Sequence, residues 1–314
     1  MNEQPSIADQ YTRALLVDID SVIPNLALMH ISAWIKDKGG IAGWNIDDPT
    51  HAFISVIFTK NKGRALSVAK MLEVQYPNIK MDIGGTGYDL HKRIKESEHY
   101  APDYSLYPNL DYGIGYTTRG CTRKCSFCSV PEMYNGFEIA QHPSEFVNKG
   151  SKKIRILDDN ILLNVKRFGE VTKWAIDNDM IIDFENLDIR LMNLSVAERL
   201  KQLRHSKPWH FAFDDMSYAD KVEYGLKCLK TAGINVKNNC TFYVYLDSDK
   251  DFYDALERCN ILRAYGTNSY LMINGSIPAK KRTQRMIDLK RWCFPSAYWA
   301  SPFSDYDRRA TNDC

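Results

Sequence analysis

Short apolar runs alternate along this chain with longer amphipathic stretches. In the first hundred residues, positions 14–17, 53–58 and 79–83 are runs typical of buried strands. Apolar positions between Leu26 and Ile35, and a stretch over about 63–75, predict the intervening helices. Strands that alternate with helices predict a parallel sheet covered on both faces. We therefore expect an α/β fold that begins with a small Rossmann-like domain.

The alternation resumes after a segment rich in charge, proline and tyrosine. Candidate strands lie at 112–116, 154–157, 181–184, 210–213, 240–246 and 270–273. Candidate helices lie at 165–178, 196–204, 219–231, 252–264 and 282–292. These six βα units predict an incomplete (β/α)6 TIM-like barrel. The expected organisation is a Rossmann-like domain over 1–100, a linker at 101–110, the barrel over 111–295 and a tail at 296–314.

Composition narrows the class of protein. Hydrophobic residues make up 44% and charged residues 25%, which excludes a disordered or fibrous chain. The net charge of +2 gives no argument for a nucleic-acid or membrane partner. No run approaches the roughly 18 apolar residues that cross a bilayer, and residues 1–10 are too polar for a secretory signal. We expect a cytoplasmic protein, in which the eight cysteines do not form structural disulfides.

Three cysteines fall in one loop after the first strand of the second half. Cys121, Cys125 and Cys128 have the spacing C-x3-C-x2-C, and Gly120 before them permits a close backbone approach. In a parallel barrel this loop lies at the rim where active sites form. Three thiolates can hold three irons of a [4Fe–4S] cluster and leave the fourth iron without a protein ligand. The alternative is a Cys3His zinc site completed by His142, although zinc loops favour paired C-x2-C knuckles.

This loop resembles the radical S-adenosylmethionine (radical SAM) superfamily, in which an aromatic residue precedes the last cysteine as Phe127 does here. The resemblance implies a [4Fe–4S] cluster whose open iron binds SAM through its amino and carboxylate groups. Reduction of the cluster then cleaves SAM to methionine and a 5′-deoxyadenosyl radical. It also implies a low-potential electron donor of the flavodoxin or ferredoxin type.

Polar residues at the ends of predicted barrel strands are candidates to line the site. By resemblance, Asp158 and Asn160 contact the SAM amino group, Arg190 with Asp188 contacts its carboxylate or ribose, and Asp214 lies near SAM. The alternatives are a helix N-cap at 158–160 and an internal ion pair between Asp188 and Arg190. Four further residues could supply a proton or quench a radical, with barrel packing as the alternative; they are His205, His210, Tyr243 and Tyr245.

The first half resembles the cobalamin-binding domain that precedes radical SAM cores in one large subgroup. Residues 24–28 and the glycine turn at 84–87 carry this resemblance. Domains that ligate cobalt through histidine have D-x-H-x-x-G after the first strand, and here Asp20 replaces the histidine and Ile23 the glycine. A carboxylate is a poor substitute for imidazole at this metal, so we expect a vestigial domain. The glycine turn is interpreted as a tight turn or, alternatively, as a phosphate cradle.

The leading hypothesis is a radical SAM enzyme that abstracts hydrogen from an unidentified substrate. One alternative is a cobalamin-dependent radical SAM methyltransferase, with cobalamin as an additional cofactor. Another is a methylthiotransferase, which usually needs three further cysteines, whereas residues 1–120 contain none. The last is a metal-binding protein without catalytic activity.

Overall fold

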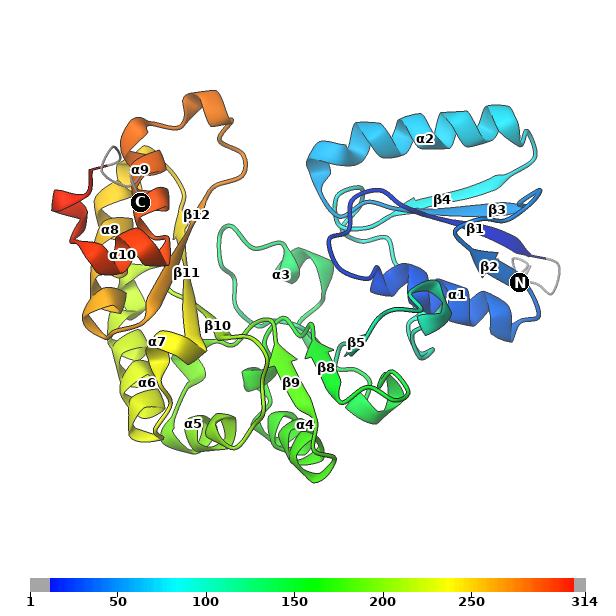
Figure 1. The fold of residues 1–314 in the computed structure, drawn as a ribbon. Coiled ribbons are helices and arrows are strands. Elements are labelled where there is room, and N and C mark those ends of the chain that lie inside the picture. Colours follow the sequence, from blue (N-terminus) through cyan, green and yellow to red (C-terminus); the bar gives the residue numbers. More distant parts are fainter. Residues whose placement is uncertain (1–11, 308–314) are drawn as a thin grey trace. The chain divides into compact units, whose positions relative to one another are not determined.

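The computed structural model describes residues 12–307 of the chain, which form two compact units (Figure 1). Unit 1 runs up to Ile154 and unit 2 begins at Arg155. Both are mixed α/β structures with parallel strands, which confirms the α/β class of the prediction. The polar residues 1–10 and the last of the eight cysteines, Cys314, lie outside the described residues.

A four-stranded parallel sheet forms the centre of unit 1. Its order is β2 (Ile41–Gly43), β1 (Arg13–Asp18), β3 (His51–Ser55) and β4 (Lys80–Gly84). Three of these strands were expected from their apolar runs. The short strand β2 was not, because only its middle residue is buried.

Helices α1 (Leu26–Asp37) and α2 (Lys62–Gln75) lie on opposite sides of this sheet (Figure 1). Asn25 is the N-cap of α1, since its side chain accepts a hydrogen bond from the Leu28 N–H at 3.2 Å. Ile54, Val56, Ala65 and Ala69 form a buried cluster with Ile19. The parallel sheet of the first half is thus confirmed.

The remainder of unit 1 contains short elements. Within the segment before β5 (Gly113–Gly115), the Asp103 carboxylate accepts hydrogen bonds from Ser32 and Lys36 of α1, each at 2.6 Å. Beyond β5, strands β6 (Thr118–Gly120) and β7 (Phe137–Ile139) pair in antiparallel fashion, and α3 (Val130–Met133) lies between them in sequence.

Parallel strands follow one another through unit 2, beginning in β8 (Lys153–Ile156). Strand β9 (Ile181–Phe184) comes next, and the Glu185 N–H just after it donates to the Ile156 carbonyl at 3.0 Å. The Leu187 N–H donates to the backbone carbonyl of His210 at 3.1 Å. Strand β10 (Trp209–Ala212) pairs with β11 (Cys240–Leu246), which pairs with β12 (Asn268–Ile273). Each of these strands coincides with a predicted one, to within a few residues.

The helices of unit 2 lie on one side of its strands (Figure 1). Predicted and observed bounds agree fully for α6 and α8. The helices are α4 (Val165–Asp177), α5 (Leu194–Lys201), α6 (Ala219–Thr231), α7 (Val236–Asn239), α8 (Phe252–Ala264), α9 (Gln284–Trp292) and α10 (Pro295–Ala300).

Aromatic residues near the C-terminus complete the core of unit 2. Trp292 and Tyr298 are fully buried with ring centroids 4.8 Å apart, and Phe303 lies 5.6 Å from Trp292. These contacts support packing as the role of the aromatic tail. Over residues 12–307, no helix combines the length and apolar composition required to cross a membrane.

Candidate functional site

Polar residues from three successive strand ends meet in unit 2. Asn160 follows β8, Asp188 follows β9 and Asp214 follows β10. The Asn160 Nδ2 donates to Asp188 Oδ2 at 3.2 Å, so the first two strand ends are joined directly. Since the carboxyl ends of parallel strands meet at one edge, this is the location expected for a site in such a fold.

Asp188 and Arg190 form a bidentate ion pair. The Arg190 Nε lies 2.7 Å from Asp188 Oδ1, and its Nη2 lies 3.1 Å from Oδ2. Asp188 also accepts the Arg190 backbone N–H at 3.1 Å, as the N-cap of a short 3-10 helix over Ile189–Leu191. The internal ion pair considered from the sequence is therefore present. It holds a guanidinium at the site and engages two of its donor nitrogens.

Tyr218 contributes a ring and a hydroxyl to this cluster. The guanidinium carbon of Arg190 lies 4.7 Å from the centre of the Tyr218 ring. The Tyr218 hydroxyl accepts the backbone N–H of Asp214 at 2.6 Å. Tyr218 thereby links the arginine to the end of β10.

Asp214 is a titratable group at this site whose pKa is shifted toward neutral pH. Burial raises the pKa of Asp214 to about 6. The hydrogen bond from the Tyr245 backbone N–H and the cations Arg258 and Arg190 lower this pKa, but burial outweighs them. The Tyr245 N–H donates to Asp214 Oδ1 at 3.0 Å. A carboxyl group with such a pKa changes its charge close to neutral pH, which is a property of many functional sites.

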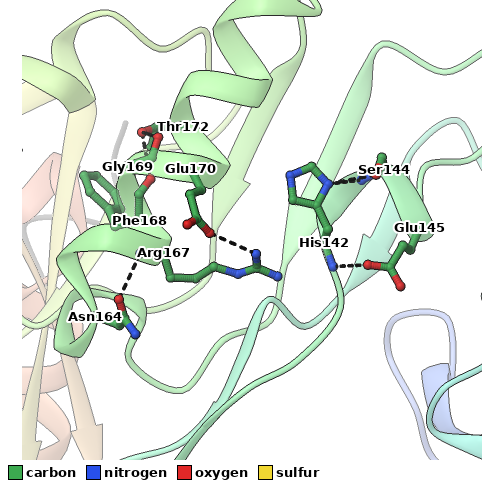
Figure 2. A network of polar contacts seen from close by, with 9 residues as sticks. All are labelled: His142, Ser144, Glu145, Asn164, Arg167, Phe168, Gly169, Glu170 and Thr172. Carbon is green, nitrogen blue, oxygen red and sulfur yellow. Dashed lines mark hydrogen bonds and ion pairs between the residues drawn. The ribbon is translucent and has the colours of Figure 1, made fainter.

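Asp158 is 1% exposed in the same segment as Asn160, which is 3% exposed. Asn160 stands at the N-cap position of a 3-10 helix over Ile161–Leu163 but its side chain makes no capping hydrogen bond there, and α4 is capped by a different residue. Asn164 caps α4, since its side chain accepts the Arg167 N–H at 2.9 Å (Figure 2).

The cysteine loop lies in unit 1 between β6 and α3. Cys121, Cys125 and Cys128 are each partly buried, whereas Phe127 is 45% exposed. The Arg123 N–H donates to the Cys121 Sγ at 3.4 Å, and the Cys128 N–H donates to the Cys125 carbonyl at 3.1 Å. The loop therefore begins in a turn that places the Cys121 thiol near a backbone N–H group and ends in a backbone turn.

Gly120 is required at the start of this loop. Its φ is +81°, and a Cβ there would clash with the carbonyl oxygen of Gly136. The expectation that the loop needs a close backbone approach at Gly120 is confirmed.

The chemistry of the loop suits a soft metal, since three thiols lie within eight residues. Among the described residues, no group of three or more His, Cys, Asp and Glu side chains is arranged to hold a metal ion. His142, the fourth ligand of the zinc alternative, caps a 3-10 helix over Pro143–Glu145 (Figure 2). The His142 Nδ1 lies 2.8 Å from the Ser144 hydroxyl. The His142 backbone N–H donates to the Glu145 carboxylate at 2.6 Å.

Asp20 stands where cobalt-ligating domains have histidine. Its carboxylate accepts hydrogen bonds from the N–H groups of Ile57 and Phe58 at 2.7 and 3.0 Å and from Asn61 Nδ2 at 2.8 Å. Burial alone would raise the pKa of Asp20, but these hydrogen bonds outweigh it and lower the pKa. Asp20 thus fastens the loop after β1 to the loop after β3.

The glycine turn at 84–87 packs against the same loop. Gly85 has a φ of +93°, and the Gly87 N–H donates to the Val56 carbonyl at 3.0 Å. The N–H groups of Tyr88 and Asp89 both donate to the Gly85 carbonyl. These contacts support the tight-turn interpretation, because the N–H groups of Gly87, Tyr88 and Asp89 are bonded within the protein and do not point to a phosphate.

Sequence reasoning missed Tyr218 and Arg258 at the unit 2 site. Arg258 is 3% exposed and donates to the carbonyls of Phe213 and Tyr245 at 2.8 and 3.0 Å. It lies in α8, far along the chain from the strand ends it joins. The one available signal was an arginine on the otherwise apolar side of a helix, which requires polar partners.

No protein-family model matches this chain, and comparison with curated proteins gives no significant match.

Proposed function

We propose that this chain is a [4Fe–4S]-dependent radical SAM enzyme that abstracts hydrogen from an organic substrate. The observation that carries the proposal is the C-x3-C-x2-C loop in an α/β chain of parallel strands. The residues that resemble the superfamily support it, as does the polar cluster at the strand ends of unit 2. The proposed architecture of the second half is an incomplete (β/α)6 barrel.

Cys121, Cys125 and Cys128 would hold the cluster as thiolates. When bound, the cluster supplies the electron that cleaves SAM into methionine and a 5′-deoxyadenosyl radical. The loop's exposed residues Thr122, Lys124 and Ser126 leave its surface open to solvent. Arg123 and Lys124 give this loop a positive charge that favours an acidic electron donor of the flavodoxin or ferredoxin type.

The strand-end cluster of unit 2 would bind the polar parts of SAM. Asp158, Asn160 and Asp214 offer oxygen acceptors for the N–H groups of the SAM amino group. Arg190, held by Asp188 over the Tyr218 ring, offers a fixed positive charge for the carboxylate or ribose. Because Asp188 accepts hydrogen bonds from two nitrogens of the Arg190 guanidinium, Asp188 acts as the positioning residue for Arg190.

The proposal is tested by anaerobic reconstitution of the full chain with iron and sulfide. We expect about four irons per chain and an EPR signal of a reduced cluster that changes on addition of SAM. With dithionite and SAM, 5′-deoxyadenosine should accumulate and be detected by mass spectrometry. Cys125→Ser should abolish both the cluster and the product.

Ser126→Ala is the matched control, because Ser126 is an exposed neighbour in the same loop. It should retain iron and turnover. Tightly bound zinc that requires His142 would support the zinc alternative. About four irons without any SAM cleavage would support a binding protein and overturn the enzyme proposal.

A further inference from the structure

One face of the β10–β11–β12 sheet differs from that of an ordinary parallel sheet. Alternate residues of these strands, such as Trp209, Phe242 and Leu271, are at most 1% exposed. Their neighbours on the other face are partly buried or exposed, with Tyr270 at 42% and Met272 at 45%. Parallel sheets usually have both faces covered and read as continuous apolar runs. The open face therefore needs an explanation besides packing.

Three rings lie side by side across this face. His210, Tyr243 and Tyr270 come from three adjacent strands, and the register pairs Tyr243 with Tyr270. The His210 and Tyr243 rings are stacked with centroids 5.4 Å apart and planes at 24°. The Tyr243 and Tyr270 rings meet edge to face at 5.8 Å and 88°. We call His210, Tyr243 and Tyr270 the aromatic face.

Charged groups flank the aromatic face at both ends. Beside His210, Arg155 forms an ion pair with Glu185, and Lys207 Nζ lies 4.0 Å from Glu185. At the other end, Lys290 Nζ lies 5.7 Å from the centre of the Tyr270 ring. Burial lowers the pKa of His210, so this imidazole is neutral near pH 7. Three cations (Arg155, Lys207 and Lys290) and two carboxylates (Glu185 and Asp183) therefore lie near the rings, which leaves an excess of one positive charge.

We propose that the aromatic face binds a planar aromatic or heteroaromatic ring that carries an anionic group, as the substrate of this protein. A flat ring stacks on or against the exposed Tyr270 ring and the partly buried Tyr243 ring, which a saturated ring of the same size does less well. The anionic group is drawn by the positive excess at the border. The identification of this ligand as a substrate rests on the proposed function, whereas its binding does not.

The test uses the full chain without iron and two probes that differ in one property. Indole-3-acetate has a planar ring and a carboxylate, and cyclohexylacetate has the carboxylate on a saturated ring. Ligand-observed NMR titrations should give indole-3-acetate a Kd about tenfold lower than that of cyclohexylacetate. Raising the salt concentration should weaken binding of both probes.

Variants locate the binding. Tyr270→Leu should raise the Kd for indole-3-acetate about fivefold, and Tyr243→Phe should leave it within about twofold because the ring remains. Lys290→Gln should raise the Kd for both probes by a similar factor. Tyr224→Leu is the control, since Tyr224 is an exposed tyrosine on α6. It should have no effect.

Equal affinity for the two probes, no binding of either, or an unchanged Kd in Tyr270→Leu would each overturn the inference. The failure of the two proposals is distinguishable. SAM cleavage without ring binding would refute only the aromatic face as a binding site. Ring binding without SAM cleavage would refute only the proposed enzyme chemistry.

Discussion

Replacement of Asp214 by Asn tests the electrostatics of the strand-end cluster. The pKa of Asp214 lies at about 6 instead of 3.8, chiefly because of burial. Between these two pH values the folded protein keeps a proton that the unfolded chain has lost. The free energy of unfolding of the wild type therefore falls as the pH rises from about 4 to about 6, and this contribution is constant above that range. Asp214→Asn keeps an oxygen for the Tyr245 N–H and removes the titration.

The magnitude follows from the pKa difference of about two pH units. At about 1.4 kcal/mol per pH unit, the ionised carboxylate destabilises the folded state by roughly 3 kcal/mol near pH 7. The stability of the wild type relative to Asp214→Asn should therefore decrease by about this amount between pH 4 and pH 7. Urea unfolding at each pH, followed by tryptophan fluorescence, measures this difference.

Asp215→Asn provides a control of the opposite sign. Asp215 caps the next turn by accepting the Ser217 N–H at 2.7 Å, and this hydrogen bond lowers its pKa. The stability of the wild type relative to Asp215→Asn should increase with pH through the acidic range. If the difference between the wild type and Asp214→Asn is flat or rises from pH 4 to 7, the assigned environment of Asp214 is incorrect.

Three further predictions concern other parts of the chain. Gly120→Ala should abolish the iron binding that we propose for the cysteine loop. Gly136→Ala, also at positive φ but with nothing within 4 Å of its Cβ, should lower stability by about 1–2 kcal/mol and leave that binding unchanged. Burial lowers the pKa of His30 to about 4, so the folded state does not take up the proton that the unfolded chain binds below pH 6.5. The stability of the wild type relative to His30→Gln should therefore decrease by roughly 3 kcal/mol as the pH falls from 7 to 4. A pH-independent difference in urea midpoints would contradict this. In iron-free protein, a maleimide should label Cys125 within minutes. It should label Cys240 only on unfolding, because Cys240 is buried and burial raises its pKa to about 12. Peptide mass spectrometry measures both rates, and equal rates would refute the burial of Cys240.

Sequence patterns were sufficient where local periodicity and burial coincide. The buried residues of α6 and α8 recur at spacings of three or four, with Arg258 as the charged member in α8, and the bounds of both helices were predicted to the residue. The short antiparallel pair β6 and β7 was not predicted, because three-residue strands with few buried side chains lack a detectable period.

The candidate site divides in the same way. The ends of parallel strands are recognisable in sequence, so the positions of Asn160, Asp188 and Asp214 could be predicted. The hydrogen-bond or ion-pair partner of each side chain could not be predicted, because it depends on the direction in which the side chain points. Arg190 had two open roles, and the structure shows that its fork engages Asp188. Arg258 reaches the strand ends from a helix that begins well after them, a contact that no local pattern encodes.

Buried and partly exposed side chains alternate along β11, so the two faces of this strand have different roles. Cys240, Phe242, Val244 and Leu246 are buried and fix the register, since a shift by one residue would turn them to the open face. Residues at the positions between them can therefore change without loss of the core. A lineage could exchange the rings on the open side for other side chains, and so acquire a new ligand, while the fold stays the same.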